Sequence, residues 1–145
     1  MRGYFGIGIY QPKTAENIGT LWRSAYQMGA SFIFVIGKRY KKQGADTYQA
    51  YRHIPLYNYE TYEDFQKARP YDCQLIGIEF CEKSRPIKDF VHPQQAIYIL
   101  GSEDGGLPNV VIEDCQHILE LPSVRQPSYN VAVAGSLVMY NRQFV

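Results

Sequence analysis

Residues 16–29 read ENIGTLWRSAYQMG and lie between two apolar runs, YFGIGIY at 4–10 and FIFVIG at 32–37. In the middle stretch, apolar residues recur at intervals of three and four, which predicts an amphipathic helix. The two flanking runs have the length and composition of buried strands. A strand, a helix and a second strand in this order predict two parallel strands joined by a helical crossover.

The same alternation of strand and helix patterns continues to the end of the chain. Strands are expected at 54–58, 73–80, 96–101 and 117–121, and helices at 60–69, 109–115 and 129–143. Asn109 is expected to cap the short helix that follows Pro108. The sequence therefore predicts an α/β fold, a parallel sheet with helices on both faces, in a single domain over residues 1–145.

Composition argues against several classes of protein. The chain has 145 residues, 46% of them hydrophobic, and a net charge of +1. It contains no apolar run of about 18 residues, so no membrane span is expected, and its N-terminus lacks the pattern of a signal peptide. We therefore expect a cytoplasmic protein. The three cysteines do not pair evenly and the three histidines are scattered, so neither a disulfide nor a metal site is expected.

A basic segment follows the second strand. Its charged residues are interleaved with tyrosines, and they are Lys38, Arg39, Lys41, Lys42 and Arg52. Basic side chains can hold phosphates and aromatic rings can stack on bases, so the segment is a candidate RNA contact. A solvated surface loop explains the same residues equally well.

Three polar stretches each follow an apolar run and lead into a helix. They read YQPKTAENIG at 10–19, LGSEDGGLPN at 100–109 and LPSVRQPSYN at 121–130. Ligands of parallel sheets bind beyond the carboxyl ends of the strands, so chemistry is expected in these loops. The second contains no lysine and holds two acidic residues, so it does not match a phosphate-binding loop and suits a neutral or cationic ligand. In the third, Ser128 or Asn130 is also suited simply to cap the final helix.

The three loops carry three motifs in order. Asn-x-Gly-x-x-x-Arg-x-Ala is complete at 17–25, Gly-x-Glu and then Gly-Leu occur within 101–107, and Leu-Pro and then Ser-Tyr-Asn-Val occur within 121–131. This ordered set resembles the SpoU branch of the SPOUT RNA methyltransferases, the TrmH-like family. Where that family usually has leucine or methionine, this chain has Tyr129.

The resemblance implies a fold in which the C-terminal segment threads an earlier loop, giving a deep trefoil knot. It also implies a homodimer that binds S-adenosyl-L-methionine in the knot and transfers the methyl group to a ribose 2′-hydroxyl of RNA. Because the chain resembles the minimal members of the family, tRNA is favoured over rRNA as the substrate. Such a protein would reach RNA with its own surface, its dimer partner's surface or a helper protein.

The resemblance also assigns roles to individual residues. Arg23 is the implied catalytic arginine, Asn17 positions it or the substrate, and Glu103 orients these polar groups. The methyl donor and the ribose are implied to meet at Ser128 and Asn130. The implied cofactor-binding residues are Ile78, Glu79, Leu100, Gly101, Leu121, Pro122, Ser128, Asn130 and Val131. Candidate RNA contacts are the basic residues Lys38, Arg39, Lys41, Lys42, Arg52 and Arg125.

Three roles for Arg23 are open at this point. Arginine is a very weak base, so Arg23 acting as the base requires its own proton to be moved elsewhere first. We favour a guanidinium that stabilises the developing alkoxide and aligns it for attack on the methyl group. A purely structural ion pair with Glu16 or Glu103 is the third role.

Two other functions remain open as well. A catalytically silent module with the same fold could hold RNA or the cofactor without turnover. An unrelated α/β nucleotide-binding protein would instead be stabilised by NAD or ATP and not by S-adenosylmethionine.

Overall fold

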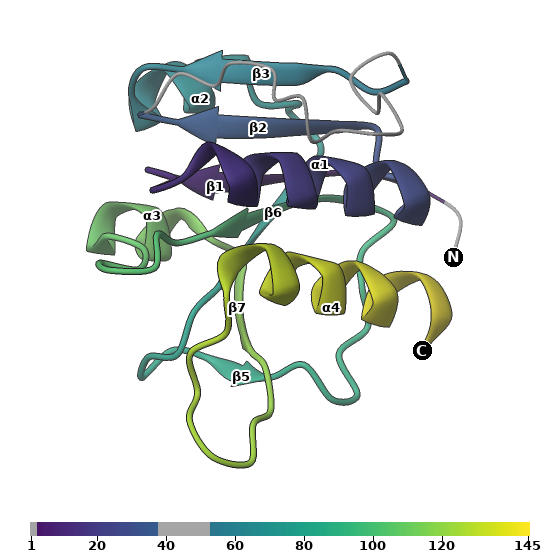
Figure 1. Cartoon of the computed structure of the whole chain (residues 1–145), viewed down its shortest axis with the longest axis vertical. Coiled ribbons are helices and arrows are strands. Elements are labelled where there is room, and N and C mark those ends of the chain that lie inside the picture. The colour runs from purple at the N-terminus through teal and green to yellow at the C-terminus, as the bar shows by residue number, and fades with distance from the viewer. Residues whose placement is uncertain (1–2, 38–52) are drawn as a thin grey trace.

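The computed structural model describes residues 3–37 and 53–145 (Figure 1). Within them the elements are β1 (Tyr4–Tyr10), α1 (Ala15–Met28), β2 (Phe32–Ile36), β3 (Leu56–Tyr59), α2 (Tyr62–Ala68), β4 (Gln74–Ile78), β5 (Arg85–Pro86), β6 (Gln95–Leu100), α3 (Asn109–Asp114), β7 (His117–Glu120) and α4 (Val131–Phe144). One sheet of order β3-β2-β1-β6-β4-β7-β5 contains all these strands, and every neighbouring pair is parallel. The predicted α/β fold is confirmed. No helix in these two ranges is long and apolar enough to cross a membrane.

The expected elements are all present, with bounds that differ by a few residues. β5 was not predicted, because its two residues are too few to give an alternating pattern. The expected cap at Asn109 is wrong. Pro108 is the N-cap residue of α3, without a side-chain hydrogen bond, and Asn109 is already helical. The proline ring fixes φ, here at −71°, and so directs the chain into the helix without a polar cap.

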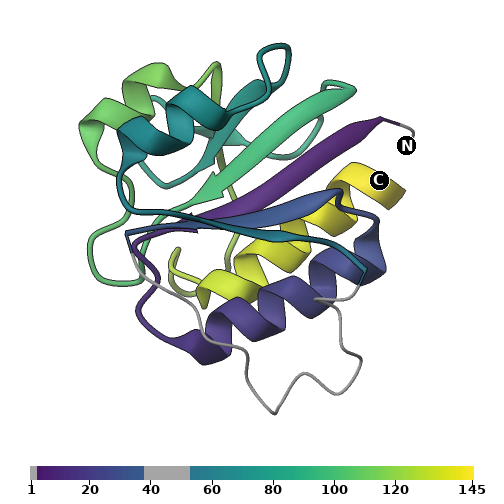
Figure 2. The ribbon, with the colours of Figure 1, turned by 90° about the horizontal axis from the view of Figure 1, so that it is seen from above.

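Helices cover both faces of the sheet. α1 and α4 lie side by side on one face, and α2 and α3 lie on the other (Figure 2). The central strands β1 and β6 are therefore buried on both sides, which explains their continuous apolar sequences. Gly6 of β1 leaves room for a ring of β2, because a Cβ there would lie 2.2 Å from Cζ of Phe32.

Local signals fix the ends of α1. The Thr14 side chain accepts a hydrogen bond from the backbone N–H of Asn17 at 3.2 Å, so the helix begins slightly earlier than expected. It ends at Gly29, whose φ of 86° is accessible to glycine at a C-cap. Of the predicted apolar stripe, Met28 is partly buried and the buried residues are Ile18, Leu21, Trp22 and Ala25.

Small residues bring α4 close to α1. A Cβ on Gly135 would lie 2.5 Å from Cδ1 of Leu21, and the hydroxyl oxygens of Ser136 and Ser24 are 2.9 Å apart. For Gly135, packing inside the chain accounts for the glycine.

The strand order also sets the path of the C-terminal segment. Residues 79–94 leave β4, form β5 on the far side of β7 and then return to β6. β7 therefore lies between β4 and β5, inside the span of that segment, and the chain continues from β7 into α4 beside α1. A knot needs a C-terminal segment that runs through an earlier loop, and this strand order provides such a loop.

Arg142 connects α4 to the end of the segment at residues 79–94 through hydrogen bonds. Its guanidinium donates to the backbone oxygens of Pro93 at 2.7 Å and Gln94 at 2.8 Å. It also donates to Oη of Tyr98 at 3.1 Å and lies 4.9 Å from the ring centre of Phe5. Only 3% of the surface of Arg142 is exposed, so water cannot solvate its charge. The hydrogen bonds to these partners replace that solvation.

His92 extends the same buried cluster. Its Nδ1 lies 2.6 Å from Oη of Tyr98, and its Nε2 lies 2.6 Å from Oδ1 of Asn141. Burial lowers the pKa of His92, the hydrogen bond with Asn141 opposes that shift, and the charge of Arg142 adds to it. A neutral ring protonated on Nε2 satisfies the whole cluster, because Arg142 then donates to Tyr98, Tyr98 to His92 and His92 to Asn141.

Candidate functional site

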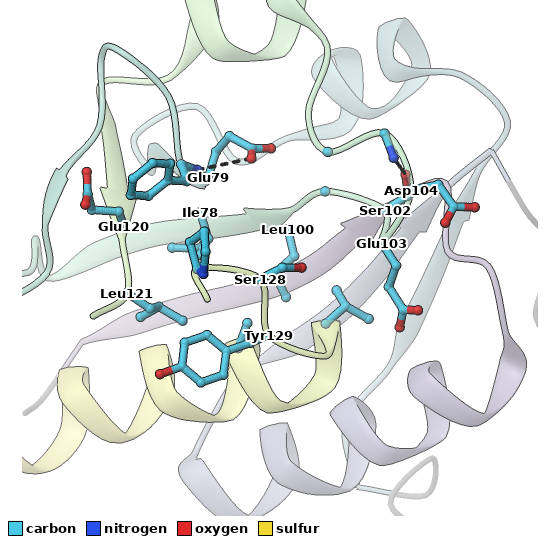
Figure 3. Close-up of a pocket in the computed structure, with 17 residues that line it drawn as sticks. Ile78, Glu79, Leu100, Ser102, Glu103, Asp104, Glu120, Leu121, Ser128 and Tyr129 are labelled. Atoms are coloured by element: carbon cyan, nitrogen blue, oxygen red, sulfur yellow. Dashed lines mark hydrogen bonds between the residues drawn. The ribbon is translucent and has the colours of Figure 1, made fainter. Parts of the chain in front are cut away.

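A pocket of about 350 Å³ opens beyond the carboxyl ends of β4, β6 and β7 (Figure 3). Ligands of parallel sheets are expected to bind at this edge, and the size is within the range of small-molecule sites. The described residues that line it are Ile78, Glu79, Phe80, Leu100, Gly101, Ser102, Glu103, Asp104, Gly105, Gly106, Glu120, Leu121, Pro127, Ser128, Tyr129, Val131 and Ala134.

Apolar side chains and carboxylates make up most of the pocket lining. The larger aliphatic side chains come from strand ends and the start of α4, and they are Ile78, Leu100, Leu121 and Val131. All charged side chains among the described lining residues are acidic: Glu79, Glu103, Asp104 and Glu120. This lining suits a ligand with an apolar body and a neutral or positively charged centre, as expected from the second loop.

Beside the pocket, one hydrogen-bonded cluster joins all three motifs. Nδ2 of Asn17 donates to Oε1 of Glu103 at 2.6 Å. Nδ2 of Asn130 donates to Oδ1 of Asn17 at 3.0 Å and to the same Glu103 oxygen at 3.4 Å. Oδ1 of Asn130 caps α4 by accepting from the backbone N–H groups of Ala132 and Val133. Glu103 also lines the pocket, so the cluster fixes the position of one pocket carboxylate.

Most of the residues expected to bind a cofactor do line the pocket. They are Ile78, Glu79, Leu100, Gly101, Leu121, Ser128 and Val131. Pro122 and Asn130 are not among the lining residues. Pro122 is exposed in the segment after β7, and the Asn130 side chain faces Asn17 and Glu103.

The expected catalytic and RNA-binding residues are only partly accounted for by the pocket. Arg23 lies half-buried on α1, six residues after Asn17, and is not among the residues that line the pocket. Arg125 is exposed in the segment between β7 and α4. The expected RNA contacts that lie outside the described residues are Lys38, Arg39, Lys41, Lys42 and Arg52.

Some lining residues were missed by the sequence reasoning. Phe80 and Glu120 each adjoin a predicted residue at a strand end, so their position in the chain is a signal that could have identified them. Ala134 follows Val131 by three residues on α4, and that helical spacing places both on one face. Burial within the pocket, by contrast, has no signature in the sequence.

Tyr129 closes the segment that precedes α4. Its hydroxyl donates to the backbone oxygen of Pro122 at 2.5 Å, and its ring lies along the pocket (Figure 3). The hydrogen bond ties together the two ends of residues 122–129. The tyrosine that departs from the family pattern therefore contributes to the shape of this loop.

Comparison with known sequences gives related proteins over most of the chain. A model of the family described as SpoU rRNA Methylase matches residues 5–140. A tRNA (cytidine(34)-2′-O)-methyltransferase of Beijerinckia indica subsp. indica is 25% identical over 142 residues, which cover 92% of this chain and 86% of the relative. A protein of the same name from Ancylobacter novellus is 22% identical over 141 residues, covering 92% of this chain and 87% of the relative.

Solved structures share the fold. An AdoMet-bound rRNA methyltransferase from Sinorhizobium meliloti has a TM-score of 0.86 at 21% identity, over 98% of this chain and 56% of that one. This chain thus spans little more than half the length of that protein. A structure described as giving insights into the 2-OH methylation of C/U34 on tRNA has a TM-score of 0.82 at 19% identity, over 97% of this chain and 94% of that one. The predicted knotted α/β fold is confirmed by these matches.

Proposed function

Since this chain belongs to the SpoU rRNA Methylase family, we propose that it transfers the methyl group of S-adenosyl-L-methionine to a ribose 2′-hydroxyl of tRNA. The observation that carries the proposal is the cluster of Asn17, Glu103 and Asn130 beside the pocket, because each family motif contributes one of its residues. The names of the curated relatives support tRNA over rRNA and position 34 as the modified nucleotide.

The pocket is the proposed cofactor site. S-adenosylmethionine supplies an activated methyl group on a positively charged sulfonium, and the acidic lining is suited to that charge. Leu100, Leu121 and Val131 offer apolar surface for the adenine. At Gly101 a Cβ would lie 2.4 Å from the backbone of Gly106, so this part of the wall is backbone alone.

Asn130 is proposed to position other groups and not to contact the cofactor with its side chain. A side-chain amide has two N–H donors and an oxygen with two lone pairs. The two donors are used by Asn17 and Glu103, and the oxygen accepts from Ala132 and Val133. With the amide engaged in this way, Asn130 links the start of α4 to the carboxylate of Glu103.

Glu103 and Arg23 are proposed to act on the ribose. Glu103, held by the two asparagines, would orient the 2′-hydroxyl next to Ser128, which lines the pocket. As the hydroxyl oxygen attacked the methyl carbon, the bond from that carbon to the sulfonium sulfur would break to leave a neutral thioether, and the hydroxyl proton would pass to water. A guanidinium would stabilise the negative charge that develops on the oxygen. Because arginine keeps its proton near neutral pH, we assign Arg23 the stabilising role and not that of the base.

An apolar stripe on α4 supports a homodimer. Val133, Leu137, Tyr140 and Phe144 follow one another at helical spacings of four, three and four, and they are 47%, 40%, 52% and 66% exposed. A contiguous exposed apolar stripe of this kind is typical of a protein interface. We propose that a second copy of the chain covers it.

Basic residues are proposed to contact the RNA. Arg125 is exposed in the segment that borders the pocket, and the cluster formed by Lys38, Arg39, Lys41, Lys42 and Arg52 is the second candidate contact. A net charge of +1 provides little long-range attraction for RNA, so a helper protein is part of the proposal. A tRNA substrate of this kind is consistent with activity in the cytoplasm.

Two measurements test the proposed function together. The first is a thermal shift, in which S-adenosylmethionine should raise the melting temperature and NAD and ATP should not. The second is transfer of labelled methyl to total tRNA, with Arg23→Ala as the comparison. Label that resists alkaline cleavage and is lost in Arg23→Ala supports the proposal. Cofactor binding without transfer would favour the catalytically silent module, and stabilisation by NAD or ATP alone would mean that the pocket binds a different nucleotide.

A further inference from the structure

Glu79 is the first residue after β4, and both oxygens of its carboxylate accept backbone hydrogen bonds. Oε2 accepts from the N–H of Leu107 at 2.8 Å and Oε1 from the N–H of Phe80 at 3.1 Å. Its own backbone N–H donates to the oxygen of Leu119 at 3.0 Å, which anchors the residue to β7. We propose that Glu79 is a positioning residue that holds the turn at residues 101–107 in the shape needed for cofactor binding, an inference that rests on the proposed function.

The turn at residues 101–107 is folded back on itself. The N–H of Gly106 donates to the backbone oxygen of Ser102 at 3.0 Å, and the N–H of Gly105 donates to Oγ of Ser102 at 3.2 Å. Gly106 has φ of 62°, and a Cβ there would lie 2.4 Å from Oε2 of Glu79. The carboxylate therefore packs directly on Gly106, and any larger residue would displace it.

This turn connects the two parts of the site. It forms one wall of the pocket, and it carries Glu103, on which Asn17 and Asn130 converge. Leu107, at its end, is buried with 6% of its surface exposed, and the Glu79 carboxylate is the acceptor for its backbone N–H. A hydrogen bond to a charged acceptor is stronger than a neutral one, and losing it leaves a costly unpaired donor.

The contacts give Glu79 a role different from the one implied by the family resemblance. That role was direct binding of the cofactor. With Oε1 and Oε2 engaged by Phe80 and Leu107, the carboxylate instead acts through the turn. The negative charge of Glu79 could also simply attract a positively charged ligand. The two roles can be distinguished, because only the positioning role depends on the geometry of the hydrogen bonds.

The test compares Glu79→Ala, Glu79→Gln and Glu82→Ala. Glu82 is an exposed carboxylate in the same loop, so its removal changes the charge equally and is expected to leave binding unchanged. Glu79→Ala should weaken S-adenosylmethionine binding about tenfold or more in calorimetry, the effect of losing one charged hydrogen bond. It should also speed hydrogen exchange at the Leu107 amide. Glu79→Gln keeps one acceptor oxygen and should fall between the wild type and Glu79→Ala in both measurements.

Gly106→Ala provides a second, independent test. With Glu79 present, the added Cβ would lie 2.4 Å from its Oε2, whereas in the Glu79→Ala background that collision is absent. The loss of affinity caused by Gly106→Ala should therefore be smaller in Glu79→Ala than in the wild type. The strain of placing alanine at the positive φ of residue 106 is the same with and without Glu79.

Two results would overturn the inference. One is Glu79→Ala with wild-type affinity and unchanged exchange at Leu107. The other is equal loss in Glu79→Ala and Glu79→Gln with no change in exchange, since that outcome assigns the effect to charge alone. If the wild type itself did not bind S-adenosylmethionine, the proposed function would fail, and exchange at Leu107 would still decide whether Glu79 holds the turn.

Discussion

Asn17 and Asn130 are 113 positions apart in the chain, and their side chains meet in a hydrogen bond of 3.0 Å. Asn17 lies in the first turn of α1 and Asn130 caps α4, so this bond joins the starts of the two helices that cover one face of the sheet. Glu103 accepts from both residues. Asn17 therefore lies at the start of a helix whose buried face packs on the sheet, and its side chain connects that helix to Glu103 and Asn130.

Asn130→Ser separates capping from the network. Serine is a good N-cap residue but lacks the amide donors that reach Asn17 and Glu103. We expect the free energy of unfolding to fall by less than about 1 kcal/mol and methyl transfer to fall by about tenfold or more. Chemical denaturation and initial rates measure the two effects.

Asn130→Ala is the matched comparison for that variant. It removes the cap as well as the donors, so it should lose about 1 kcal/mol more stability than Asn130→Ser while showing a similar loss of activity. Wild-type activity in Asn130→Ser would mean that the contacts of Asn130 with Asn17 and Glu103 have no part in catalysis.

Much of the fold was predictable because its signals are local. The stripe of Ile18, Leu21 and Trp22 has helical spacing, and the buried strands are continuous apolar runs. The candidate site was predictable to a similar extent, since polar residues after parallel strands gather at one edge of the sheet. The family resemblance supplied the knot, which no local pattern encodes.

The remaining features depend on contacts between distant residues. Nothing near Glu79 in the sequence indicates that its carboxylate accepts from Leu107, 28 residues away. The same is true of Arg142, whose partners at Pro93 and Gln94 lie on another part of the chain. β5 was missed because its two residues become a strand only by pairing with β7, and they carry no strand pattern of their own.

Gly135→Ala tests the close packing of α1 on α4. The added methyl would lie 2.5 Å from Cδ1 of Leu21 and 3.0 Å from Cδ1 of Leu100. We expect a loss of about 1–3 kcal/mol in the free energy of unfolding, as for other overpacked cores. Leu21→Val shortens the nearest side chain, so the double variant should be more stable than the sum of the single effects predicts. Strict additivity in chemical denaturation would contradict the packing account.

Stability should depend on pH through His92. Burial lowers the pKa of His92 below its ordinary 6.5, so in mildly acidic solution the unfolded chain binds a proton that the folded chain does not. This contribution is fully present above the unfolded pKa and is lost as the pH falls from there toward the folded pKa, with a slope of up to about 1.4 kcal/mol per pH unit.

His92→Gln isolates that contribution. The variant cannot titrate at this position, so its difference in unfolding free energy from the wild type should shrink as the pH falls from about 7 to about 5. Denaturant titrations of both proteins over that range measure the difference. A difference that stays constant would mean that His92 gains no proton on unfolding in this range.

Leu137→Glu tests the proposed dimer interface. A charge in the middle of the apolar stripe on α4 should convert the dimer to a monomer in sedimentation equilibrium. Val110→Glu is the control, because Val110 is 53% exposed on α3, which covers the opposite face of the sheet. The interface would lie elsewhere if Leu137→Glu remained dimeric or if Val110→Glu also dissociated.

The most direct test of the central claim is to react unmodified tRNA with the protein and S-adenosylmethionine and to locate the new methyl group by mass spectrometry of nucleosides and oligonucleotides. We predict a 2′-O-methylated nucleotide at position 34 in the wild-type reaction and its loss in Arg23→Ala. A methyl group on a base, or no methylated nucleotide despite cofactor binding, would contradict ribose methylation by this site.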